Sequence, residues 1–170
     1  MSIGMLFGQR YICKNGHVSF NGSTPLENIE ANNHQAASIL DASTGELVFT
    51  VLIKSFEFKQ ALMQEHFNEN YMESDKFPKA TFKGKITNLS SFNFTKDGTF
   101  NVDATGDLTI HGVTKPITIK GVIVVKNGDV SANSKFIVKP VDYNIQIPKL
   151  VEGKIAKEIE VNTDLAYSKM

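Results

Sequence analysis

Acid-base or metal chemistry in this sequence would fall to a cluster of Glu65, His66 and His111. Carboxylate and imidazole groups bind metal ions and transfer protons, so these three side chains define one candidate site. Glu65 and His66 are adjacent in a segment with helical spacing and therefore point roughly 100° apart, a poor arrangement for two ligands of one ion. An enzyme centred on His66 and His111 is thus kept as an alternative. Structural hydrogen bonding is the competing interpretation of both histidines.

Other catalytic signatures do not occur in the sequence. It has no glycine-rich phosphate loop, no nucleophile elbow and no His-Glu-x-x-His motif. The single cysteine, Cys13, can form neither an intrachain disulfide nor a multi-cysteine metal site. We therefore expect a protein that is not an enzyme and that carries no metal and no cofactor other than a bound ligand.

The charges exclude two classes of partner. Lys and Arg number 18 and Asp and Glu number 18, which gives a formal net charge of +0. Nucleic acids and anionic membrane surfaces require clustered excess Lys and Arg, and no such run occurs here. No stretch approaches the roughly 18 consecutive apolar residues of a membrane span, so stable membrane insertion is not expected. A small apolar molecule remains as the expected partner, and a homodimer is compatible with the sequence.

The elements that must position any site show period-two alternation, which is typical of strands with one dry and one wet face. The alternation is unbroken over 99–110, and it recurs over 17–20, 28–40, 45–54, 80–87, 117–125 and 159–167. Turns are predicted at 112–116 and at the Asn-Gly pair within 126–129. The pattern predicts an all-β fold, in which about eight antiparallel strands close into a barrel.

One segment has helical spacing instead. Over 56–71, apolar residues recur four positions apart, which predicts a helix, and 148–157 is expected to form a shorter helical turn. We expect a single barrel domain over 9–170. Residues 1–8 contain too short an apolar run for an intact signal peptide, and are interpreted as the remnant of one or as added residues.

The predicted inner face mixes large apolar residues with very small ones. On it we expect Ile29 and Ile39 together with the small residues Ala31, Ala37, Gly84, Ala104, Gly106 and Gly121. In a barrel whose walls have a fixed spacing, small inward side chains favour empty space, and such a space would be dry and would accept an apolar ligand. In the competing interpretation the helix fills the gap, and the barrel is a packed interaction domain.

The residues expected to bind the apolar part of a ligand are the large inward ones, with two helix residues closing the cavity. They are Phe20, Leu47, Phe49, Val51, Met63, Phe67, Phe82, Phe100, Val102, Leu108, Ile119 and Phe136. Polar contacts to its head group are expected near the mouth from His66, Asn70 and His111.

Two strings resemble a known family. Residues 106–116, GDLTIHGVTKP, and the segment 66–82, which joins the helical histidine to a Phe-Pro step and a strand, are similar to the signature of the YceI-like family, the lipocalin-like polyisoprenoid-binding proteins of bacteria. The resemblance extends from about Tyr11 to Tyr167. It implies an extended barrel that holds a long isoprenoid, isoprenoid quinone or fatty-acyl chain, and a periplasmic or secreted location.

The chain departs from that family at two places that concern the head group. An Arg-Asp pair is common before the helical histidine, where this chain has Met63, Gln64 and Glu65, and an early Asp is replaced by the neighbourhood of Lys14 and Asn15. These losses favour a neutral or weakly polar head over a pyrophosphate. The resulting hypothesis is non-enzymatic binding, sequestration or transport of a long-chain apolar lipid inside the barrel.

Overall fold

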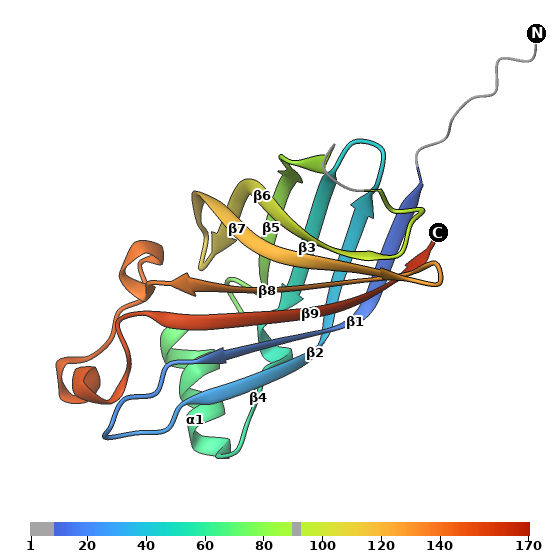
Figure 1. Ribbon diagram of the computed structural model, residues 1–170. Coiled ribbons are helices and arrows are strands. Elements are labelled where there is room, and N and C mark those ends of the chain that lie inside the picture. The colour runs from blue at the N-terminus through green and yellow to red at the C-terminus, as the bar shows by residue number, and fades with distance from the viewer. Residues whose placement is uncertain (1–8, 90–92) are drawn as a thin grey trace, which may run out of the picture.

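The computed structural model describes residues 9–89 and 93–170, and its main feature is a closed antiparallel barrel (Figure 1). Its order is β1-β9-β8-β7-β6-β5-β3-β2, and pairing of β1 with β2 closes the ring. The predicted fold class is confirmed. Residues 1–8 lie outside the described residues. The barrel strands are β1 (Arg10–Asn21), β2 (Glu30–Asp41), β3 (Glu46–Leu52), β5 (Lys79–Ile86), β6 (Gly98–Ile110), β7 (Val113–Lys126), β8 (Asp129–Val138) and β9 (Ile159–Lys169).

Two tight turns join β6, β7 and β8. Asn127 and Gly128 have φ values of 51° and 85°, as the sequence predicted for the second turn. The first turn is shorter than predicted, because His111 (φ 53°) and Gly112 (φ 74°) are enough to reverse the chain. Val113 pairs with Ile110 directly after them. The expected turn at 112–116 was therefore wrong beyond Gly112, and β7 includes Pro116.

The inner face of β2 shifts by one residue along the strand. Asn33 pairs with Val18 and Ala36 with Gly16, so β2 carries an extra residue between them. Such a bulge reverses which face each later side chain takes. The expectation that Ala37 and Ile39 point inward was wrong for this reason: Ile39 is 41% exposed, and the buried residues are its neighbours. The bulge coincides with the polar run at 32–35, which interrupts the alternation of apolar and polar residues.

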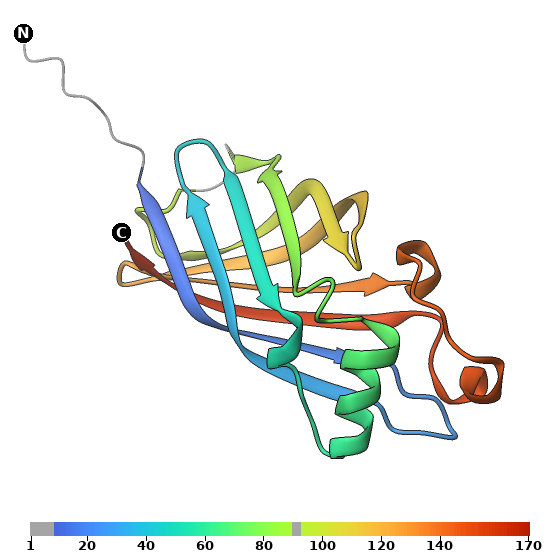
Figure 2. The same cartoon turned by 180° about the vertical axis from the view of Figure 1, so that it is seen from behind.

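The predicted helix begins later than expected. Residues 56–58 are extended, and Glu57–Phe58 form the short strand β4, which pairs with Ala31 and Asn32 of β2. The helix α1 then covers Ala61–His66 and continues as a π-helical turn over Phe67–Tyr71. The free edge of β2 offers backbone partners that a helix would forgo, which explains the difference at 56–58. The helix lies against one end of the barrel (Figure 2).

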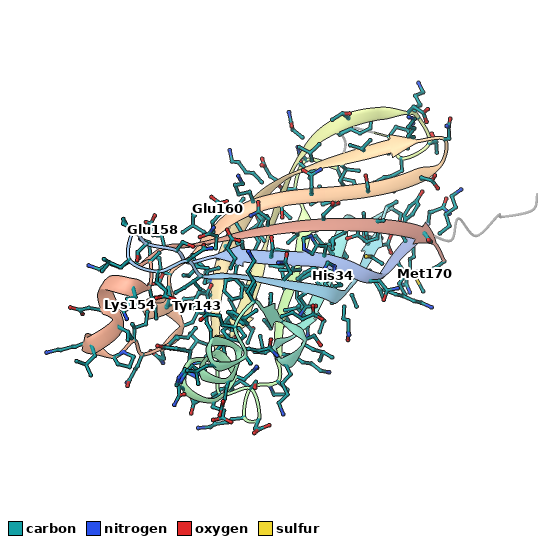
Figure 3. All side chains as sticks on the ribbon, turned by 90° about the horizontal axis from the view of Figure 1, so that it is seen from below. His34, Tyr143, Lys154, Glu158, Glu160 and Met170 are labelled. Atoms are coloured by element: carbon teal, nitrogen blue, oxygen red, sulfur yellow. The ribbon has the colours of Figure 1, made fainter. Side chains whose placement is uncertain are left out.

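The connection from β8 to β9 contains two 3-10 turns, Pro140–Tyr143 and Lys149–Lys154. The second lies within the predicted turn at 148–157. Tyr143 is buried, and its side chain lies towards the opposite end of the elongated molecule from Met170 (Figure 3). Over 9–89 and 93–170, the structure contains no helix of the length and apolarity needed to cross a membrane.

Several neighbouring strands are joined over only part of their length: β5 and β6 pair over six positions, and β2–β3 and β7–β8 are also partly paired. Residues 37–40 of β2 pair with residues 47–50 of β3. The earlier part of β2 pairs with β4 instead. β7 and β8 pair over only the six positions from Gly121–Ser134 to Lys126–Asp129. The barrel wall therefore parts beside the early part of β2 and between β7 and β8.

Candidate functional site

A cavity of about 100 Å³ lies in the middle of the barrel. Its walls come from β2, β3, β5, β6, β7, β8 and β9, and most of the lining side chains are apolar. The exceptions are Asn133, Ser134, Thr163 and Tyr167, which all belong to β8 and β9. The interior is therefore dry on most sides and polar along one wall.

Seven of the predicted apolar contact residues line this cavity. They come from β3, β5, β6, β7 and β8 and are Leu47, Phe49, Phe82, Val102, Leu108, Ile119 and Phe136. The cavity is also bounded by residues that were not among the predicted ligand contacts, chiefly Leu40, Ile86, Ala104, Ile123 and Leu165. The alternation contained the signal for all of them except Leu40, which the bulge in β2 turns inward.

The other predicted contact residues lie outside this cavity. Phe20, Val51 and Phe67 belong to a buried cluster beneath the helix. Phe100 packs against the cluster near the chain termini. Met63 is half-buried on α1. Alternation shows which face a side chain takes but not how far along the barrel it lies, and these residues point inward at other levels or from the helix.

Aromatic rings occupy the end of the barrel under the helix. The ring centroid of Phe67 lies 5.0 Å from that of Phe58, 5.4 Å from that of Phe20 and 5.8 Å from that of Phe56. Phe20 and Phe56 are themselves 5.1 Å apart in an edge-to-face arrangement. These distances are typical of packed aromatic side chains. Side chains thus fill this end of the barrel. The alternative interpretation of the sequence, a barrel packed by the helix, expected the whole interior to be filled in this way.

Small inward residues have two different roles. Ala104 and Gly121 line the cavity, but a Cβ on Gly121 would lie 2.8 Å from the carbonyl oxygen of Asn133, so of these two only Ala104 marks empty space. Gly84 and Gly106 instead allow β5 and β6 to approach each other, since a Cβ on Gly106 would lie 2.3 Å from the Cα of Gly84. Ala31 belongs to the cluster under the helix. Small size therefore marks empty space at some inner positions and close strand contact at others.

Two hydroxyl pairs interrupt the apolar interior. The Oγ of Ser134 lies 2.5 Å from the Oγ1 of Thr163, and the Oγ of Ser38 lies 2.7 Å from the hydroxyl of Tyr167. Burial raises the pKa of Tyr167, and the hydrogen bond with Ser38 opposes that rise only in part. The predicted polar contacts did not include Ser134, Thr163 or Tyr167, although their positions on the inner alternation of β8 and β9 could have indicated them; Ser38 faces inward because of the bulge in β2.

The histidines predicted to contact a head group do not line the cavity. The Nδ1 of His66 is 3.0 Å from the Oδ1 of Asn70 on the exposed helix surface. His111 donates through Nδ1 to the carbonyl oxygen of Tyr143 at 2.9 Å, while its Nε2 lies 2.6 Å from a carboxylate oxygen of Glu73. His111 therefore ties the β6–β7 turn to two other segments.

Metal and thiol chemistry find little support in the geometry. Within the described part of the chain, no three His, Cys, Asp or Glu side chains gather closely enough to hold a metal ion. Cys13 is buried, and that burial raises the pKa of its thiol. A thiolate is the reactive form of cysteine, so Cys13 is a packing residue.

Comparison with known proteins matches this chain to one family. The model of the YceI-like domain matches residues 14–167. A UPF0312 protein of Vibrio parahaemolyticus is 33% identical over 54% of this chain and 44% of its own length. The protein YceI of Escherichia coli is 29% identical over 68% of this chain and 52% of its own length. The chain spans about half the length of these curated relatives.

Solved structures share the architecture at low sequence identity. A polyisoprenoid-binding domain from Saccharophagus degradans superposes with a TM-score of 0.82 at 14% identity, over 94% of this chain and 98% of its own. BcnA of Burkholderia cenocepacia gives a TM-score of 0.76 at 16% identity, over 90% and 96% of the two chains. At these identities the likeness concerns the fold.

Proposed function

The chain belongs to the YceI-like domain family, and from this membership we propose that it binds the apolar chain of a single-chain lipid inside the barrel. The observation that carries the proposal is the dry cavity between Phe49, Phe82, Ala104 and Phe136. Cavities of this kind stay free of water and accept apolar molecules. The polyisoprenoid-binding domain of Saccharophagus degradans has the same fold, which supports an isoprenoid, isoprenoid quinone or fatty-acyl compound as the ligand.

The cavity sets a limit on how the ligand is held. A cavity of about 150 Å³ accommodates one benzene molecule, so about 100 Å³ holds only a short stretch of chain. A longer chain must displace side chains, and Leu47, Phe49 and Phe136 are only half-buried. Each methylene removed from water contributes about 0.8 kcal/mol, which makes chain length the main source of affinity.

The predicted contact residues that do not line the cavity would bind only a ligand that is longer than the cavity. Phe20, Val51 and Phe67 would meet a chain that displaces the aromatic cluster. Met63 and Phe100 would meet one that extends beyond the cavity. Contacts of His66, Asn70 and His111 with a neutral head group remain a prediction under the same condition.

We further propose that the protein carries its ligand without catalysis and is exported to the periplasm or secreted, as the resemblance to its family implies. The alternative enzyme would need Glu65, His66 and His111 to act together. His66 pairs with Asn70, and His111 with Glu73 and Tyr143. The absence of catalysis is tested by elemental analysis of the purified protein and by ligand binding of the His66→Ala and His111→Ala variants. Export is tested by fractionation of the producing cells.

The direct experiment is organic extraction of the purified protein followed by mass spectrometry, together with uptake of cis-parinaric acid, a fluorescent polyunsaturated fatty acid. We expect a reproducible lipid in the extract, or saturable uptake by protein from which lipid has been removed. The absence of both would overturn the proposal and leave the barrel as an interaction domain.

A further inference from the structure

The wall of the barrel opens between β7 and β8. β7 pairs with β6 over residues 113–125, and β8 pairs with β9 over residues 130–138. Beyond Gly121 and Ser134, however, the two strands no longer pair with each other. Figures 1 and 2 show β7 curving away from β8 on the side of this point that is remote from their hairpin. Residues 113–120 of β7 and 135–138 of β8 thus form two facing strand edges.

The sequence keeps these edges from closing. Pro116 lies in the part of β7 that does not pair with β8, and proline has no backbone N–H to donate to a neighbouring strand. Lys120 and Lys135 stand exposed at the first position of each edge beyond the last pair. Proline and lysine on an edge are the features by which proteins prevent further strand pairing. The opening is therefore a property of these strands and not a consequence of a missing neighbour.

An outer hollow meets the inner cavity at the point where the strands part. The hollow has a volume of about 420 Å³ and is lined by Asn101, Lys120, Lys135 and Asn162, among others. It shares Gly121, Val122, Asn133, Ser134 and Thr163 with the lining of the cavity. Gly121 contributes no side chain to the wall here. The same few residues thus separate solvent from the interior.

The inner side of this junction carries the polar part of the cavity. The hydroxyls of Ser134 and Thr163 lie 2.5 Å apart, and one hydroxyl proton is used between them. The second proton can be donated to an oxygen atom of a ligand. Lysine and asparagine side chains of the hollow offer further donors on the outer side. Oxygen acceptors are therefore favoured at the junction and apolar chain in the cavity behind it.

We infer that the opening between β7 and β8 is a lateral portal, through which a lipid chain enters the cavity while its oxygen-bearing head group stays at the Ser134–Thr163 junction. This inference rests on the proposed function and adds to it the route and the orientation of the ligand. The end of the barrel under the helix is a poor alternative route, since the rings of Phe20, Phe56 and Phe67 fill it.

The route is tested by covering the portal from outside. Lys135→Cys, labelled with a polyethylene glycol maleimide, is compared with the unlabelled variant in stopped-flow binding of cis-parinaric acid. A cover over the portal hinders both directions of passage, so the association and dissociation rate constants should fall together by about tenfold, with Kd almost unchanged. Lys126→Cys, labelled in the same way at the hairpin end of β7, is the matched control. The wild type controls for labelling of the buried Cys13.

The outcomes separate the route from the function. Rates that the label at position 135 leaves unchanged, or that the label at position 126 lowers equally, would overturn the portal while binding itself persists. Absence of binding by the unlabelled protein would overturn the proposed function and the portal with it.

The orientation has a second test. Thr163→Val removes the hydroxyl but keeps the shape of the side chain, and should weaken binding of cis-parinaric acid about fivefold, as the loss of one hydrogen bond would. Thr109→Val, on the outer face of β6, is the matched control and should bind like the wild type. Unchanged affinity in Thr163→Val would place the head group elsewhere.

Discussion

The two places where the barrel wall parts are closed in opposite ways. Beside the early part of β2, the short strand β4 is added and the rings of Phe20, Phe56, Phe58 and Phe67 fill the space behind it. At the parting of β7 and β8, a glycine and two hydroxyl side chains stand between a hollow and a cavity. Large rings maximise buried apolar contact, whereas small residues forgo it. The first region therefore stabilises the fold, and the second is the one that we propose admits a ligand.

The largest effect should come from the filled region. Phe56 is buried among the other rings, and Phe56→Ala should lower the free energy of unfolding by about 3–5 kcal/mol, because it removes a large side chain and leaves a void. Urea denaturation measures this. Leu62→Ala, whose side chain on the helix is 63% exposed, is the control and should change stability by less than about 0.5 kcal/mol. If folded Phe56→Ala protein also lost ligand affinity, the aromatic end would have to be counted as part of the binding site.

A smaller effect is expected at the buried hydroxyl pair beside the cavity. Tyr167→Phe leaves the hydroxyl of Ser38 buried without its partner, which should cost about 1–3 kcal/mol of unfolding free energy. The effect should be absent in the double variant Tyr167→Phe, Ser38→Ala, where neither partner is left. An equally large loss in the double variant would mean that packing, and not hydrogen bonding, holds Tyr167.

The same residue predicts how stability changes in alkali. Burial raises the pKa of Tyr167 in the folded state, while in the unfolded chain it ionises near about pH 10. Its contribution to stability is thus fully present below about pH 10 and is lost progressively above it. Urea denaturation from about pH 8 to about pH 11 should show a steeper loss in the wild type than in Tyr167→Phe. The unfolding free energy of the variant should still fall in part with rising pH, because burial also raises the pKa values of Tyr11, Tyr71 and Tyr143.

A larger side chain in the cavity should change the affinity for the ligand more than the free energy of unfolding. Ala104→Leu places extra carbon atoms in the cavity and should weaken cis-parinaric acid binding by about tenfold, because cavity and ligand compete for one volume. Ala166→Leu, on the outward face of β9, is the control. Equal affinity of both variants would show that the chain is held elsewhere.

The smallest effect should come from charge at the filled end. Lys54 and Asp75 form an ion pair with both side chains mostly exposed. Lys54→Ala should lower the free energy of unfolding by less than about 0.5 kcal/mol, since solvent screens such pairs. A loss comparable to that of Phe56→Ala in urea denaturation would contradict the view that rings hold this end together.

The sequence allowed more of the fold than of the site to be predicted. Unbroken alternation fixes which residues of a strand share a face, and this was enough for an antiparallel barrel. It contains no information on pairing partners, so the polar run at 32–35 interrupts the alternation of β2 without showing that the bulge turns Ala37 and Ile39 outward. The same lack of information hid the parting of β7 and β8: Pro116, Lys120 and Lys135 disfavour further pairing, but the sequence does not show which strand they face.

The sequence predicted which side chains of the site face the interior of the barrel, but not how far along the barrel each one lies. Leu47, Phe82 and Phe136 line the cavity because inward side chains of neighbouring strands meet there. Phe20 and Phe67 were grouped with them because they are large and apolar, yet they fill a different level of the interior. Ser134 and Thr163 lie on the inner alternation, but only the structure shows that the two hydroxyls meet where the strands part.

We propose that the middle of the barrel, and not its aromatic end, holds the lipid chain. The most direct measurement is a crystal structure with a fatty acid that carries bromine on its chain, located by anomalous scattering. We expect a bromine peak inside the cavity bounded by Ala104, Ile123 and Phe136. A peak among Phe20, Phe56 and Phe67, or only on the outer surface, would contradict it.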